Sequence, residues 1–99
     1  MSPKLPLDLE PYKRTPDFTE ATVPAGLLAD HSTKDGVWGL IVVDEGCLRY
    51  VVTDPRRAWP ERLLRPEDEP GIVEPTIVHR IEPLGPVRFH VEFQRQRKP

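Results

Sequence analysis

The sequence has only one cysteine, no long apolar run and no marked excess of charge of either sign. A single cysteine, Cys47, excludes an intramolecular disulfide. Because no histidine stands close to it in sequence, we expect a small core residue rather than a nucleophile. The longest apolar run, Val37 to Val43, is too short to span a membrane. The N-terminus also lacks the positive-then-apolar layout of a signal peptide. These absences predict a protein of the reducing cytoplasm.

The net charge is −2, from 14 basic and 16 acidic residues, so no broad attraction to nucleic acid or to a membrane surface is expected. Glycine-rich phosphate loops and the CxxC and HExxH motifs are absent. Neither serine, Ser2 nor Ser32, stands in a nucleophile elbow. The arginines of residues 54–70 alternate with acids, which indicates a neutralised surface loop. The sequence therefore offers no catalytic residue and no cofactor-binding motif.

Proline is abundant instead, with 13 residues in a chain of 99. Proline is excluded from helix interiors and central strands, so long helices are not expected. We predict one domain over residues 1–99. Residues 1–16 are predicted to be an extended lead-in that four prolines keep from regular pairing. Residues 94–99 are predicted to be a frayed basic tail.

Between the prolines, short apolar segments alternate with turns. Residues 37–43 form a continuous apolar run, as expected where both faces of a strand are covered. With Gly46 in the following turn, this run and residues 48–53 predict a β-hairpin. Residues 76–82 and 87–93 predict two further alternating strands, which we expect to pair as a second hairpin. The pattern predicts an all-β fold, a small jelly-roll type antiparallel β-barrel or sandwich.

Two histidines fall on the apolar faces of their segments by a period of two. Leu27, Ala29 and His31 share one face, and Ile77, His79 and Ile81 share another. A buried imidazole needs a partner, because an unsatisfied buried polar group costs ~1–3 kcal/mol. Each histidine could bond to a backbone carbonyl or a carboxylate, or the two could converge on a divalent metal such as Zn, Fe, Ni or Mn. Both interpretations remain open.

A metal site would need a third protein ligand, for which Glu92 is the candidate. If Ile81 pairs with Val87, Glu92 points away from His79. If the register slips by one residue, Glu92 joins the same face as His79. Three other carboxylates are alternatives: Glu74, Glu82 and Asp30. For each of the four, Glu92 included, a solvated or hydrogen-bonded side chain is the better interpretation. The sequence predicts metal ligands at His31, His79 and Glu92, with the third ligand unsettled.

Residues 24–28, 31–39, 73–82 and 91–93 carry a resemblance to a known family. They resemble the small cupin-like domain found at the N-terminus of some tellurite-resistance B proteins and also as a stand-alone protein. Within the wider cupin superfamily, residues 75–79 resemble the second conserved motif, whose histidine is usually a metal ligand. The first motif departs from the pattern, because Gly39 stands where its glutamate would be. A four-ligand cupin centre is therefore not implied.

The resemblance implies a module that binds a divalent metal or a small ligand and is associated with tellurite or other oxyanion stress resistance. The larger proteins of this family carry a separate methyltransferase domain, which is absent here, so that activity does not transfer. A metal-dependent enzyme of the oxygenase or isomerase type and a non-catalytic interaction domain are the alternatives. A small molecule or oxyanion is the expected ligand, and a homodimer through exposed strand edges is the expected assembly.

Overall fold

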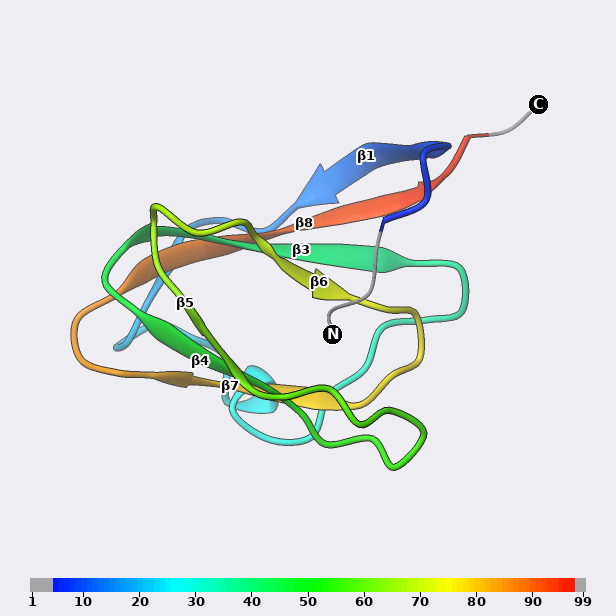
Figure 1. The fold of residues 1–99 in the computed structure, drawn as a ribbon. Helices are drawn as coiled ribbons and strands as arrows, with labels where there is room; N and C mark the ends of the chain where they lie inside the picture. The colour runs from blue at the N-terminus through cyan, green and yellow to red at the C-terminus, as the bar shows by residue number, and fades with distance from the viewer. Residues whose placement is uncertain (1–4, 98–99) are drawn as a thin grey trace.

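Two antiparallel sheets make up the structure, a computed structural model that describes residues 5–97. The larger sheet has the order β1-β8-β3-β6, with β2 also paired to β8. Its strands are β1 (Leu9–Arg14), β2 (Phe18–Thr19), β3 (Trp38–Glu45), β6 (Gly71–Val73) and β8 (Arg88–Gln96). The smaller sheet has the order β5-β4-β7. Its strands are β4 (Leu48–Val52), β5 (Arg62–Leu64) and β7 (His79–Pro83). Figure 1 shows the smaller sheet below the larger one.

The all-β prediction is confirmed, and of its two alternatives the structure forms the sandwich. No strand of the smaller sheet pairs with a strand of the larger one among residues 5–97, so the sheets do not close into a barrel. The chain crosses between them four times, at the β3–β4, β5–β6, β6–β7 and β7–β8 connections. Two of these crossings are short turns marked by glycine. The turn at Gly46 joins β3 to β4, and the turn containing Gly85 joins β7 to β8.

Both predicted hairpins are wrong for this reason. β3 pairs with β8 and β6, whereas β4 pairs with β5 and β7. Likewise β7 pairs with β4, while β8 pairs with β1, β2 and β3. Adjacent strands joined by a tight turn usually pair, but here each turn carries the chain from one layer to the other. The register alternatives considered for Glu92 therefore do not arise.

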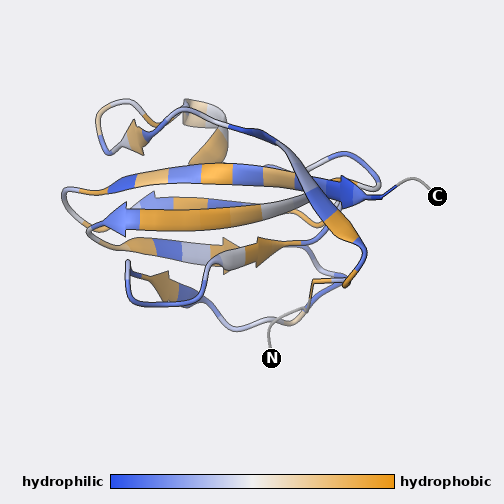
Figure 2. Ribbon diagram, turned by 90° about the horizontal axis from the view of Figure 1, so that it is seen from above, coloured by the Kyte–Doolittle hydropathy of each residue, from blue (hydrophilic) through white to orange (hydrophobic). Residues whose placement is uncertain are grey.

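The core fills the space between the sheets. Along β3, Gly39, Ile41 and Val43 are buried, while Leu40 and Val42 on the other face are only half-buried, so the expected cover on both faces is missing. Figure 2, coloured by hydropathy, shows hydrophilic and hydrophobic residues alternating along β8, the strand that leads to the C-terminus. The buried cluster joins residues from both sheets: Ile41, Val43, Leu48, Tyr50, Leu64, Val73, Ile81, Val87, Phe89 and Val91. Inward faces of two sheets pack together in this way in a β-sandwich.

The two ends of the chain are more ordered than expected. β1 pairs with β8 from Leu9 to Arg14, although Pro11 lies within it. An edge strand tolerates proline because one of its sides has no partner, and β1 is the last strand of its sheet. Gln94, Arg95 and Gln96 belong to β8 rather than to a frayed tail. The parts of these predictions that concern residues 1–4 and 98–99 lie outside the described residues.

The segment before β3 is not the strand that its alternation suggested. Residues Ala25–Leu27 form a 3-10 turn, η1, and the chain then meets β7 only at an isolated bridge between His31 and His79. This segment runs across one opening of the sandwich. No helix within residues 5–97 is long and apolar enough to cross a lipid bilayer.

Candidate functional site

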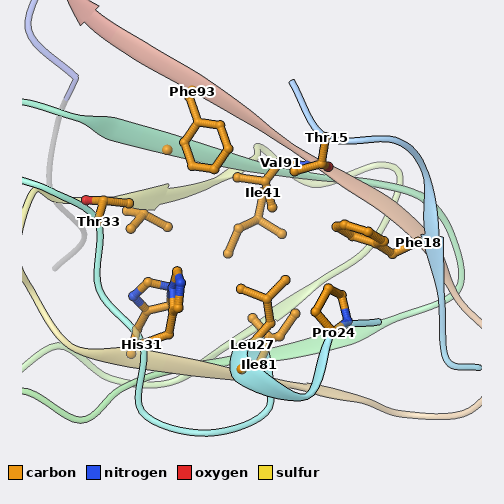
Figure 3. A pocket seen from close by; sticks show the side chains of 14 residues that line it. Thr15, Phe18, Pro24, Leu27, His31, Thr33, Ile41, Ile81, Val91 and Phe93 are labelled. Atoms are coloured by element: carbon orange, nitrogen blue, oxygen red, sulfur yellow. The ribbon is translucent and has the colours of Figure 1, made fainter. Parts of the chain in front are cut away.

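A pocket of about 270 Å³ lies between the sheets, where residues 15–33 cover the opening (Figure 3). The larger sheet contributes its inward side chains and the smaller sheet contributes the start of β7. Its apolar wall includes Phe18, Leu27, Ile41, Ile81, Val91 and Phe93. None of its lining residues is an aspartate, glutamate, lysine or arginine. The pocket is therefore apolar and uncharged, with polarity supplied by two histidines and two threonines.

The backbone brings the two histidines together. The amide of His31 donates to the carbonyl of His79, and the amide of His79 donates to the carbonyl of His31, each at 2.8 Å. This pair of bonds fixes His31 beside the start of β7 even though no regular strand surrounds it. Both side chains line the pocket. The prediction that they share an inward location is confirmed, but through a bridge rather than through two strands.

The imidazole rings meet edge to face, with centroids 5.6 Å apart and planes at 86°. Nδ1 of His79 lies 3.2 Å from the carbonyl oxygen of Ile77. Because a carbonyl oxygen only accepts, Nδ1 carries the hydrogen and Nε2 presents a lone pair. Burial lowers the pKa of His79, and the nearby His31 lowers it further, while the bond to Ile77 raises it. Neutral His79 therefore offers Nε2 as a hydrogen-bond acceptor.

Besides Nε2 of His79, the pair has one fully buried nitrogen without a partner. Nδ1 of His31 is buried and has no hydrogen bond within the described chain. On its other side His79 packs against Tyr50, with ring centroids 5.7 Å apart. The Tyr50 hydroxyl donates to the carbonyl of Ile72 at 2.9 Å, and burial raises the pKa of that hydroxyl. Tyr50 is thus a neutral wall for His79 and does not occupy its free nitrogen.

The structure does not bring Glu92 to the histidines. Val91 and Phe93 line the pocket, so Glu92 between them faces the opposite side of β8. There its carboxylate accepts a hydrogen bond from the side chain of Gln94 at 2.9 Å. It lines a shallow surface groove with residues 11–14.

The other weighed carboxylates are also engaged elsewhere. Glu74 binds Arg57 at 2.8 Å and accepts from Trp59 at 3.3 Å. Glu82 lies 3.1 Å from Arg49 and 3.1 Å from Arg80, and Asp30 accepts from Thr53 at 3.0 Å. These carboxylates are hydrogen-bonded, as the sequence favoured. No carboxylate stands among the residues lining the pocket.

The arginine-rich loop is neutralised internally, as expected. Asp54 is buried and accepts from Arg56 at 2.8 Å and from the amide of Val78 at 3.0 Å. The hydrogen bonds from Arg56 first, and then that from Val78, hold the pKa of Asp54 far below its usual range. Cys47 is a free, half-buried thiol.

A second cluster was not predicted, because its members come from three distant segments. Nδ1 of His90 lies 3.3 Å from Asp44 and 3.8 Å from Asp17. Within residues 5–97 these are the side chains of metal-ligating type that gather in a group of three, with ligand atoms within 4.8 Å of one another. Arg14 already neutralises Asp17 at 2.5 Å. Spacing in the sequence holds no signal for such a cluster.

The chain is similar to curated proteins of a bacterium. Two strains of Haemophilus influenzae have curated relatives named probable S-adenosyl-L-methionine-dependent methyltransferase TehB, 35% and 34% identical over 75 residues. The match covers 75% of this chain but 26% of either relative, so the chain spans about a quarter of their length. The name of those relatives describes the longer proteins.

Solved structures show the same relationship. The crystal structure of TehB from Haemophilus influenzae superposes with a TM-score of 0.82 at 28% identity, over 91% of this chain and 32% of that one. A protein of Escherichia coli strain K12 superposes with a TM-score of 0.82 at 24% identity, over 96% of this chain and 98% of that one, and shows the fold alone. A family model described as the TehB-like domain matches residues 13–91. The chain therefore belongs to the TehB-like domain family.

Proposed function

We propose that this domain is a non-catalytic module that binds a small molecule in the pocket between its sheets. The observation that carries the proposal is an uncharged apolar pocket with two adjacent imidazoles in its wall, one of which has a buried nitrogen without a partner. Small-molecule sites are typically apolar cavities with a few convergent polar groups. A buried polar atom without a partner is costly, and a ligand that supplies one relieves that cost.

The family relationship supports a role in resistance to tellurite or another toxic oxyanion. The relatives named TehB combine a matching segment with a much longer chain. Binding a small molecule is a task that this domain can perform alone, because its pocket is lined by its own residues. Methyl transfer is not proposed for this chain. The homodimer and the cytoplasmic location stay predictions.

A divalent metal held by His31 and His79 is the second candidate. The free Nε2 of His79 and the unpartnered Nδ1 of His31 favour it, because neutral imidazole nitrogens are common ligands of Zn²⁺, Fe²⁺ and Ni²⁺. Neither histidine belongs to a group of three metal-ligating side chains within residues 5–97. Water or a bound molecule would have to complete the coordination. Open positions of that kind are also what a metal-dependent enzyme would need.

Filling the pocket tests the leading proposal. Toluene is titrated into isotopically labelled protein and followed by amide and methyl NMR shifts. We expect saturable shifts confined to the pocket walls, which Leu27→Trp abolishes because Leu27 lines the pocket. Leu28→Trp is the matched control, since Leu28 is 42% exposed and does not line the pocket. Absence of saturable shifts, or equal loss in both variants, would contradict the proposal.

Elemental analysis distinguishes a metal site at His31 and His79 from a small-molecule site without metal. Protein purified without chelator is analysed for Zn, Fe, Ni and Mn, and metal-free protein is titrated with Zn²⁺. The metal candidate predicts binding of one ion per chain that is lost in His79→Gln and kept in His90→Gln. Metal binding that survives His79→Gln would assign the ion to another part of the chain.

A further inference from the structure

We infer that the pocket selects a neutral, compact molecule with an apolar body and one hydroxyl group, and that His79 and His31 hold this hydroxyl. The inference rests on the proposed binding function and names its ligand class. Phenols and small alcohols belong to this class, whereas carboxylates and oxyanions do not. Three features of the pocket lead to it: the hydrogen-bonding state of its polar groups, its lack of charge and its size.

The imidazoles are the polar groups that a ligand would meet. Thr33 donates its hydroxyl hydrogen to the carbonyl of Val37 at 2.7 Å, and the hydroxyl oxygen of Thr15 accepts from the amide of Val91 at 2.9 Å. Figure 3 shows Thr15 on the far side of the pocket from His31. The ring nitrogens of His31 and His79 therefore form one polar spot in the apolar wall, and the Thr15 hydroxyl hydrogen lies on the opposite side.

The polarity of that spot is set by the tautomer of His79. Its Nδ1 donates to Ile77, so Nε2 can only accept and requires a donor from the ligand. A hydroxyl donates one hydrogen and still accepts with its oxygen, so it can serve Nε2 of His79 and also contact His31. A ketone or ether lacks the hydrogen, and a carboxylate lacks it when ionised.

Charge excludes the anionic alternative. The lining residues include no lysine or arginine, so a bound anion would lose its hydration without gaining a fixed counter-charge. An oxyanion would therefore have to bring a proton with it. A neutral ligand avoids this cost.

Size limits the body of the ligand. A cavity of about 150 Å³ holds benzene, and this pocket measures about 270 Å³. By that proportion it accommodates roughly ten non-hydrogen atoms. Such a molecule can reach from the imidazoles to Phe18 and Pro24, which Figure 3 places at the other end.

Phenol, toluene and benzoate form a matched set of probes, titrated into the full chain at pH 7.5 and followed by NMR. We expect phenol to bind at least as tightly as toluene, although it is better solvated in water, and benzoate to bind about 10-fold more weakly than phenol. His79→Leu should weaken phenol about 10-fold and leave toluene within about 3-fold. His90→Leu, outside the pocket, should change neither. In the wild type, 15N shifts should show hydrogen on Nδ1 of His79 and a response of Nε2 to phenol alone.

The possible outcomes distinguish failure of the hydroxyl inference from failure of the proposed binding function. Toluene binding without phenol binding, or an Nε2 of His79 that carries the hydrogen, would overturn the hydroxyl inference and keep the binding function. Benzoate binding more tightly than phenol would replace it with an anion site. If no probe binds, the proposed function and the inference both fall. The 15N tautomer measurement uses unmodified protein, so it stands even if His79→Leu does not fold.

Discussion

His79 is the residue on which most of the candidate site depends. Its backbone fixes His31, its Nδ1 binds Ile77, and its ring separates Tyr50 from His31. It is 5% exposed, so its ionisation is coupled to folding. Burial lowers its folded-state pKa below the unfolded value of about 6.5.

This coupling predicts a loss of stability in mild acid. Below about pH 6.5 the unfolded chain binds a proton at His79 that the folded chain resists, so the free energy of unfolding falls as the pH falls. Above that pH His79 is neutral in both states, so its ionisation no longer lowers the free energy of unfolding. Urea unfolding between pH 8 and pH 5 measures the effect. His79→Gln should flatten the dependence relative to wild type in this window. An identical pH profile in both proteins would assign the acid sensitivity to other groups.

At the scale of elements, the turn between β3 and β4 decides the architecture. Gly46 has φ of +81°, and a Cβ placed there would lie 2.1 Å from the carbonyl oxygen of Pro86 in the neighbouring turn. The β3–β4 turn and the β7–β8 turn, two of the four connections between the sheets, therefore touch. A side chain at Gly46 would have to separate them.

Gly46→Ala should consequently destabilise the domain by about 3 kcal/mol or more, the sum of a backbone cost of ~1–2 kcal/mol and a steric clash with main-chain atoms. Gly85→Ala is the matched control. Gly85 also has a positive φ, +101°, but its Cβ would meet nothing within 4 Å, so only the backbone cost of ~1–2 kcal/mol applies. Urea midpoints of both variants measure the difference. Equal losses would show that the contact with Pro86 relaxes freely.

At the scale of the whole molecule, one thin core holds both sheets together. Phe89 and Leu48 are fully buried and come from opposite sheets. In a chain this short no second core can compensate for a cavity. The strands that meet in each sheet are also distant in sequence, which is typical of slowly folding β-sandwiches.

Phe89→Ala should therefore cost ~3–5 kcal/mol, a large part of the ~5–15 kcal/mol that stabilises a typical domain. Leu63→Ala is the control, because Leu63 is 39% exposed on β5 and should change stability by no more than ~0.5 kcal/mol. Equilibrium urea unfolding of both variants measures the difference. A small effect of Phe89→Ala would mean that the sheets reclose over the gap.

Local features were predictable because they depend on neighbours in the sequence. The alternation placed Ile77, His79 and Ile81 on one buried face, and it did the same for Val87, Phe89 and Val91. Proline and glycine marked the turns, including the positive φ of Gly46. The pairing of strands was not predictable in the same way, because a turn such as 44–46 fits both a hairpin and a crossing between layers. Pro11 likewise excluded a central strand but not the edge position that β1 occupies.

The sequence by itself determined the all-β class, the inward faces of β7 and β8 and the availability of two histidines for one site, because periodicity and backbone restriction act over a few residues. Only the tertiary structure decided that His31 reaches His79 through a single bridge and that Glu92 faces the other side of β8. These placements depend on which strands share a sheet. That choice is made by burial of one core across the whole chain, in which Leu48 and Phe89 belong to the same cluster, and no local pattern encodes it.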